Sequence, residues 1–426
     1  MAVYYIDFLG GDDSLDGLSP ENARKTQEGI ELLAGDSILF LRGTAFRGML
    51  KTVSGTEDEP IRYGAYGEGC EPIFCASSDL CDTSFWRLTD AENVWECTYD
   101  INGDVGNFVL DGECNATFRW NEQELCRQGD FFDSRFADGE QRRRNYSKQK
   151  LLFYSTKNPA EYYRSIECVS YADRVLGVLR SNIIIEDICF KNSGVHALAG
   201  AGKNVVVRRC RFENIGGCAW NSDLRIRFGN GVEFWNYAED VLVEDCSFIN
   251  VYDSCVTHQG GGAELLPAKN FICRRNLFDT YGMAALELRD IVANGFYFVE
   301  NECKNAGCGF AMLGETLPRS SEIWPQPMGH HVFLWRMERA TVGGYVEIKN
   351  NCFGEAPVGA AIYSIISPEA EAQFEIDENI YTKNEELLVR FGGESFSELF
   401  EYSKKTGRDT HSKYVYEYDL ASASKE

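Results

Sequence analysis

The chain has 426 residues, of which 66 are acidic and 42 are basic, and its formal net charge at pH 7 is −24. A charge of this sign argues against nucleic acid, and against an anionic membrane surface, as the main partner. Aromatic residues make up 13% of the chain and 40 residues are glycine, which suits a body of strands and turns. Length alone allows two or three domains, or one long array of repeats.

The first fifty residues are expected to form two strands around a short helix. The strand-like segments are Tyr4–Asp7 and Gly35–Gly43, and Glu21–Leu33 is predicted to be helical, with Ser19 as N-cap and Pro20 in its first turn. The loop before this helix contains Asp12, Asp13 and Asp16. Aspartates in a glycine-rich loop favour turns, and the alternative is a structural Ca²⁺ site. No cofactor is required by any other pattern.

Residues 50–115 alternate short strands with turns and are expected to form early coils of a larger body. The alternation stops at about 116–163, which we interpret as a hairpin-like insertion. Near the end of the chain, Glu394–Gly407 has an amphipathic helical pattern that stops at a glycine.

A short pattern recurs between Arg180 and Tyr381. The clearest copies are Asn182–Phe190, Asn204–Phe212, Asp240–Phe248 and Asn270–Phe278, and weaker copies begin at Gly295, Tyr345 and Gln373. Their β-branched and aromatic content and their bounding Asn and Gly residues are typical of strands. Self-similarity at this spacing indicates a solenoid, in which each repeat buries its apolar face against its neighbours.

Like residues occupy like positions in these copies. The seventh position is Ile188, Cys210, Cys246, Asn276, Asn301, Asn351 and Asn379, and the ninth is Phe190, Phe212, Phe248, Phe278, Cys303, Phe353 and Tyr381. Because stacked strands lie about 4.8 Å apart, we expect internal ladders of asparagine and aromatic side chains.

With these ladders and its cap-like ends, the chain resembles the right-handed parallel β-helix proteins of the pectate-lyase-like superfamily, among them bacterial carbohydrate-active enzymes. The resemblance implies an all-β solenoid with an N-terminal cap helix and a short C-terminal capping helix. The expected parts are a cap at 1–50, a parallel β-helix at 51–393 with its insertion at about 116–163, and a C-terminal cap and tail at 394–426.

The longest segments between repeats should mark the working side of such a solenoid. Gly216–Glu239, Asp253–Lys269 and Asn305–Gly344, with the strand at Ala284–Asp290, concentrate carboxylates, arginines and tryptophans, which suits a sugar site. The candidate catalytic residues are Asp223, Glu233, Asp253 and Glu287. The candidate substrate-binding residues are Trp220, Arg225, Trp235, His258, Gln259, Arg289 and Asp290.

Two alignments of the strand between Gly216 and Asp253 are possible, and they turn different side chains outward. In Ala284–Asp290, alternation turns Leu286 and Leu288 inward and Glu287 and Arg289 outward. Counting from the ninth repeat position, and allowing one inserted residue at Asp253, puts Asn221 and His258 at the level of Glu287, and Asp223 at that of Arg289. The competing alignment takes Gly231–Trp235 as the strand, with Glu233 and Trp235 outward.

Three functions are compatible with these residues. A glycoside hydrolase cleaving an oligosaccharide is favoured, because carboxyls on adjacent coils would lie about 5 Å apart and those two coils apart about 10 Å. A polysaccharide lyase or uronate epimerase would instead need a base, for which His258 and Arg289 are candidates. The third function is non-catalytic glycan binding.

Two further expectations concern the surroundings of the protein. The chain shows no basic start followed by an apolar run, and several of its 16 cysteines fall at buried repeat positions, so we expect reduced thiols and a cytoplasmic protein. The expected partner is an oligosaccharide or polysaccharide. A homo-oligomer formed through the side of the solenoid is compatible with the fold.

Overall fold

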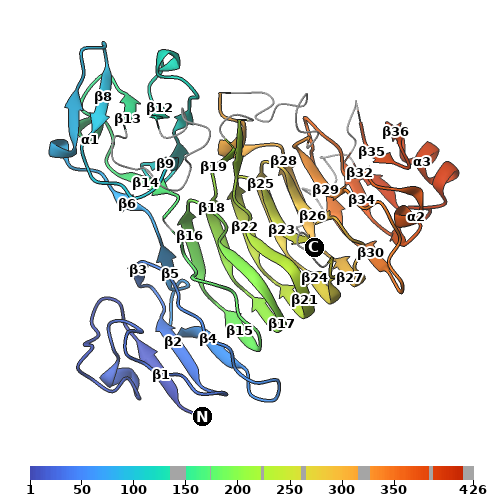
Figure 1. The fold of residues 1–426 in the computed structure, drawn as a ribbon, viewed down its shortest axis with the longest axis horizontal. Helices are drawn as coiled ribbons and strands as arrows, with labels where there is room; N and C mark the ends of the chain where they lie inside the picture. Colours follow the sequence, from blue (N-terminus) through green and yellow to red (C-terminus); the bar gives the residue numbers. More distant parts are fainter. Residues whose placement is uncertain are drawn as a thin grey trace.

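The computed structural model describes residues 1–134, 150–172, 174–221, 225–260, 265–314, 327–382 and 387–415. Figure 1 shows parallel strands stacked side by side along the chain, which is the arrangement of a parallel β-helix. The predicted all-β solenoid is therefore confirmed. The right hand of its winding stays a prediction.

Each full coil contributes three strands, one to each of three faces. The first face contains the N-terminal halves of β17 (Leu198–Arg208) and β21 (Val232–Glu244), followed by β23 (Ser254–Gln259), β26 (Ala284–Arg289), β29 (His330–Trp335), β32 (Ile362–Ile365), β35 (Val389–Phe391) and β36 (Glu394–Phe396). The second face continues from N-terminal strands that pair in parallel. It contains β1 (Val3–Ile6), β2 (Ser37–Leu41), β4 (Ile61–Tyr66), β15 (Ile183–Glu186), the C-terminal halves of β17 and β21, and then β24 (Lys269–Arg274), β27 (Asn294–Val299), β30 (Tyr345–Lys349) and β33 (Phe374–Asp377).

The third face is a separate 10-stranded parallel sheet. Its strands, in spatial order, are β3 (Ala45–Arg47), β5 (Ile73–Cys75), β16 (Cys189–Ser193), β18 (Arg211–Ile215), β22 (Ser247–Val251), β25 (Leu277–Tyr281), β28 (Glu302–Ala306), β31 (Cys352–Phe353), β34 (Ile380–Thr382) and β37 (Lys413–Val415). One continuous apolar core lies between the three faces.

Both predicted ladders are present in this core. The rings of Phe190, Phe212, Phe248 and Phe278 stack in succession, with centroids 4.5 to 5.6 Å apart. The side chains of the asparagines at the seventh position donate to one another from coil to coil, as between Asn301 and Asn351 (3.1 Å). Cys210, Cys246 and Cys303 are buried at the repeat positions, and all 16 cysteines, each within the described residues, are free thiols.

The asparagine ladder should contribute strongly to stability, because each member satisfies main-chain groups of neighbouring coils. Asn351 donates to the carbonyl of Phe298 (2.9 Å) and accepts from the backbone N–H of Asn301 (3.0 Å). We expect Asn351→Ala to lower the free energy of unfolding by about 3 kcal/mol, since it leaves buried polar groups without partners. Urea unfolding would measure this. Asn102→Ala, at an exposed position, is the control and should change it by less than about 0.5 kcal/mol.

The insertion is much larger than the predicted hairpin at about 116–163. After β5 the chain leaves the solenoid, and it returns by Val175, which is already in the solenoid core. The strands between form two mainly antiparallel sheets. One contains β6 (Ser78–Asp79), β9 (Val105–Leu110), β10 (Cys114–Asn115) and β14 (Ile166–Ser170), and the other β7 (Trp86–Leu88), β8 (Val94–Cys97), β11 (Thr117–Phe118), β12 (Asp130–Asp133) and β13 (Leu151–Tyr154). Most of the expected early coils at 50–115 therefore belong to this insertion, which spans 78–170 and has its own aromatic core.

The predicted N-terminal helix at Glu21–Leu33 is wrong. Ser19 does cap a helical turn, but this turn is a 3-10 helix of only three residues, Pro20–Asn22. The backbone of Arg24 instead pairs with the edge strand β1, donating to the carbonyl of Tyr5 and accepting from the N–H of Asp7. Covering an open sheet edge prevails here over local helix propensity.

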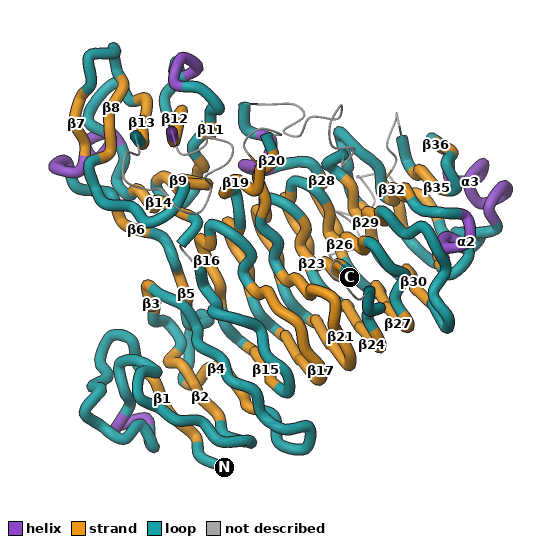
Figure 2. The backbone as a smooth tube through the Cα atoms, viewed as in Figure 1, coloured by secondary structure: helices purple, strands orange, loops and turns teal. Residues whose placement is uncertain are grey.

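Helices are few and short in the described residues, as Figure 2 shows. They are α1 (Pro159–Tyr162) in the insertion, α2 (Pro368–Glu371), and α3 (Leu399–Thr406) near the C-terminus, with 3-10 turns at Pro20–Asn22, Thr83–Phe85, Glu122–Glu124 and Gly309–Met312. The α3 helix lies inside the predicted range and ends at Gly407, whose φ is 71°. None of the described helices is long and apolar enough to cross a membrane.

Candidate functional site

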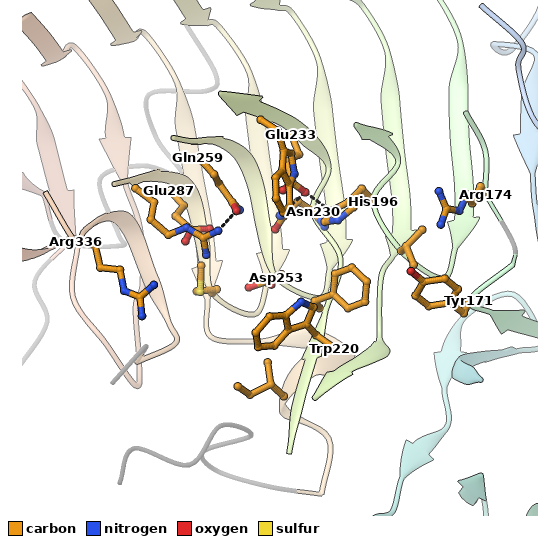
Figure 3. A pocket seen from close by; sticks show the side chains of 16 residues that line it. Tyr171, Arg174, His196, Trp220, Asn230, Glu233, Asp253, Gln259, Glu287 and Arg336 are labelled. Carbon is orange, nitrogen blue, oxygen red and sulfur yellow. Dashed lines mark hydrogen bonds and ion pairs between the residues drawn. The ribbon is translucent and has the colours of Figure 1, made fainter. Parts of the chain in front are cut away.

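A cavity of about 360 Å³ lies on the outer side of β21, β23 and β26. Figure 3 shows its wall, which combines carboxylates, arginines and aromatic rings. It is lined by Tyr171, Arg174, Val195, His196, Trp220, Ile226, Phe228, Asn230, Glu233, Trp235, Asp253, Gln259, Met283, Glu287, Arg289 and Arg336. The predicted location in the middle of the solenoid agrees with the place of this cavity.

Strand register decides between the two alignments predicted for this region. Glu233 pairs with Thr257, and Thr257 pairs with Glu287, so the two glutamates lie at one level, two coils apart. The alignment with Gly231–Trp235 as the strand is therefore correct, and the one that placed Asn221 at the level of Glu287 is wrong. Val232 and Phe234 are in the core, which turns Glu233 and Trp235 outward into the cavity.

Glu233 is fully buried yet held in its ionised form. Its Oε2 atom is in ion-pair contact with Nδ1 of His196 and accepts from the side-chain amide of Asn230 (3.0 Å). Burial by itself would raise the pKa of Glu233, but His196, Asn230 and the charge of Arg289 together hold it below its usual value. The other oxygen, Oε1, is buried without a hydrogen-bond partner, so this carboxylate can still accept a proton.

Hydrogen bonds connect Glu233 to Glu287 through the coil between them. The side-chain oxygen of Asn230 accepts from the backbone N–H of Ser254 (2.9 Å), and the hydroxyl of Ser254 donates to Oε2 of Glu287 (3.1 Å). Glu287 is 1% exposed. Asp253 precedes Ser254 on the same coil and is also in the cavity wall. Three carboxylates from three successive coils thus surround one space.

Aromatic and polar side chains form the rest of the wall. Trp220 and Trp235 keep 41% and 46% of their surface exposed, so they offer open apolar platforms. Arg289 donates to Gln259, pairs with Asp290 (3.3 Å) and stacks on Trp335. Carboxylates and amides for hydroxyl groups, next to rings for C–H faces, suit a sugar.

Some predicted site residues lie elsewhere. His258 is at the level of Phe234 and Leu288, so it faces the interior, where its Nε2 contacts the carbonyl of Asn236 (3.2 Å). Predicting it as a ligand residue was wrong, because the first alignment inverted the phase of β23. Arg225 and Asp290 do not line the cavity. Asp223 lies outside the described residues.

Sequence reasoning missed several wall residues, chiefly Tyr171, Arg174, His196, Asn230 and Arg336. One signal was available for part of the wall. Val195, Asp253 and Met283 each stand five residues after a ladder phenylalanine, and all three line the cavity. Applying this offset to Phe190 would have pointed to Val195 and its neighbour His196. Tyr171 and Arg174 precede the first clear repeat and carry no such signal.

The N-terminal aspartates serve the local backbone. Asp12 accepts from the N–H of Ser14 (2.8 Å), Asp16 from that of Leu18 (3.0 Å), and Asp13 from both the N–H and the hydroxyl of Thr26. Within the described ranges, no group of three or more His, Cys, Asp or Glu side chains is placed to hold a metal ion. The turn-forming role is therefore the one these contacts support.

No protein-family model matches the chain, and no curated protein is similar to it in sequence. Solved structures do match. A GH136 lacto-N-biosidase from Eubacterium ramulus is 15% identical, with a TM-score of 0.46 over 98% of this chain and 67% of that one. A pectate lyase is 10% identical (TM-score 0.41; 98% of this chain, 78% of that one), and a family 28 exopolygalacturonase from Yersinia enterocolitica is 12% identical (0.40; 92% and 67%). These likenesses agree with the resemblance noted from the sequence but, at such scores, carry no argument about the reaction.

Proposed function

We propose that this protein is a glycoside hydrolase that cleaves an oligosaccharide with Glu233 and Glu287. The observation that carries the proposal is the pair of buried carboxylates that point outward at one level, on either side of Thr257, in a cavity with two open tryptophans. Pairs of carboxyl groups flanking one bond are what glycosidic hydrolysis requires.

The environment of Glu233 suggests its role, and the proposal gives Glu287 the complementary one. Glu233, held ionised by His196 and Asn230, acts as the base that takes a proton from water. That water attacks the anomeric carbon while Glu287 donates its proton to the departing glycosidic oxygen. The two backbones are two strand spacings, or about 10 Å, apart, and side chains leaning together would reach the separation of inverting enzymes. Asp253 and Gln259 would bind hydroxyl groups, and Trp220 and Trp235 the apolar faces.

The lyase or epimerase hypothesis receives less support. Its predicted base His258 faces the core, and Arg289, the other candidate, already contacts Gln259 and Asp290. Non-catalytic glycan binding would use the same cavity but would not need an ionised, buried carboxylate beside a second one.

A digest of a panel of neutral and acidic oligosaccharides tests the proposal. We expect new reducing ends without the ultraviolet absorbance of unsaturated uronides. Proton NMR during the first minutes should show the product in the anomeric configuration opposite to that of the substrate. Absorbance that rises with cleavage would establish a lyase instead, and binding without any cleavage would establish a glycan-binding protein.

A further inference from the structure

The hairpin of β19 (Cys218–Asn221) and β20 (Ile226–Phe228) contacts the cavity with one face and the insertion with the other. Trp220, Ile226 and Phe228 line the cavity. Because side chains alternate along a strand, the intervening residues Ala219 and Arg227 point the other way. Ala219 packs in the aromatic core of the insertion, and Ala219 and Arg227 are paired across the hairpin. The hairpin is therefore a wall between the cavity and the insertion (Figures 1 and 3).

Arg227 joins this wall to the insertion. It is 6% exposed, and its guanidinium lies between the ring of Phe118, in the insertion, and that of Tyr252, in the solenoid, at 4.4 and 4.6 Å from the centroids. The same group donates to the carbonyl of Gly217 (2.6 Å), beside the hairpin, and to that of Gly106, on β9. The Arg227 guanidinium thus contacts both the solenoid and the insertion, through hydrogen bonds to main-chain carbonyls and through stacking on aromatic rings.

The hairpin also contacts the insertion through hydrogen bonds. The N–H of Ala219 donates to Oδ2 of Asp104 (2.9 Å), and the thiol of Cys218 to the carbonyl of Asp104 (3.3 Å). A Cβ atom at Gly106 would lie 2.3 Å from the nitrogen of Cys218, so only glycine fits there. An isolated two-stranded hairpin is marginally stable in water, so these contacts decide where the hairpin lies.

We propose that Arg227 is a positioning residue through which the insertion sets the affinity of the cavity for the sugar unit at the Trp220 end. The inference rests on the proposed function, since it assumes that the cavity binds a glycan. It gives the insertion a role in substrate recognition in addition to Tyr171, which directly follows its strand β14 and lines the cavity. The chemistry at Glu233 and Glu287, on different strands, should be left intact.

The test compares Arg227→Met with Arg47→Met. Arg47 also ties the solenoid to the insertion, through two bonds of 2.7 Å to Glu167, but far from the hairpin. With the oligosaccharide that the wild type cleaves fastest in the panel, Arg227→Met should raise KM about 10-fold and change kcat less than about 2-fold, the loss expected for one well-placed contact. Arg47→Met should leave both constants unchanged. Hydrogen exchange should quicken in residues 218–221 and 226–228 of Arg227→Met only.

An unchanged KM in a folded Arg227→Met variant would overturn the inference, and so would an equal rise of KM in Arg47→Met. If Arg227→Met does not fold, Phe118→Leu replaces it in the comparison of KM with Arg47→Met, because this variant removes only the ring above the guanidinium. Arg227→Lys keeps the charge but lacks the planar guanidinium that stacks on both rings, so it should raise KM less than Arg227→Met does. A wild type that cleaves nothing in the panel contradicts the proposed function itself, which distinguishes the two failures.

Discussion

Replacing Glu233 by glutamine should lower kcat by about 10²- to 10⁴-fold, the range over which a positioned acid or base contributes to catalysis. The amide has nearly the shape of the carboxylate but cannot take a proton from water. Steady-state rates from reducing-end release measure the change, and calorimetric titration of the variant with the same oligosaccharide should show that binding persists. Glu287→Gln should lower kcat within the same range.

The matched control lies on the same strand. Glu239→Gln removes a charge in the middle of β21 that pairs with Lys269 (3.6 Å) and does not line the cavity, so activity should be unchanged. If Glu233→Gln kept more than a tenth of the wild-type kcat, Glu233 would not be the base. Asp253 would then be the carboxylate to test next, since it lies one coil from Glu233 in the same wall.

Acidification should destabilise this protein well above the pH at which its carboxylates protonate. Burial lowers the pKa of His258 to about 4, of His330 to about 3 and of His331 to about 4, from an ordinary value of 6.5. In the unfolded chain these imidazoles bind protons near pH 6.5, so between pH 6.5 and about 4 the unfolded state holds more protons than the folded one. Stability is therefore full above pH 6.5 and is lost as the pH falls.

The expected loss at pH 5 is up to about 2 kcal/mol for each of the three histidines. Urea unfolding at pH 7, 6 and 5 measures it, and the slope against pH counts the protons taken up. His411 provides the control, because it is exposed and hydrogen bonding to Asp377 raises its pKa, so that His411→Gln should make the loss slightly steeper. A free energy of unfolding that stays constant from pH 6.5 to 5 would contradict this prediction.

Much of the architecture could be predicted from the sequence because the solenoid is locally encoded. Every coil repeats the same strand, turn and ladder positions, so Phe212 or Asn351 could be assigned to the interior from spacing alone. Glu287 and Arg289 could be turned outward by simple alternation, and both line the cavity. The longest inserts pointed to the part of the solenoid where the cavity lies, since loops rather than ladders vary between coils.

Only the tertiary structure showed the strand pairings and contacts that the repeat pattern does not encode. The phase of β21 depended on which of its residues meets Thr257 on the next coil. The phase of β23 depended on whether a residue is inserted at Asp253. A shift of one residue exchanges the buried and exposed faces, which is why His258 was placed on the wrong side. The segment predicted as a helix at Glu21–Leu33 instead pairs with the edge of β1 through the backbone of Arg24. The contact of Arg227 with Gly106 joins residues more than 100 positions apart in the sequence. Non-local contacts of this kind, which also hold the insertion in place, leave no periodic pattern in a sequence.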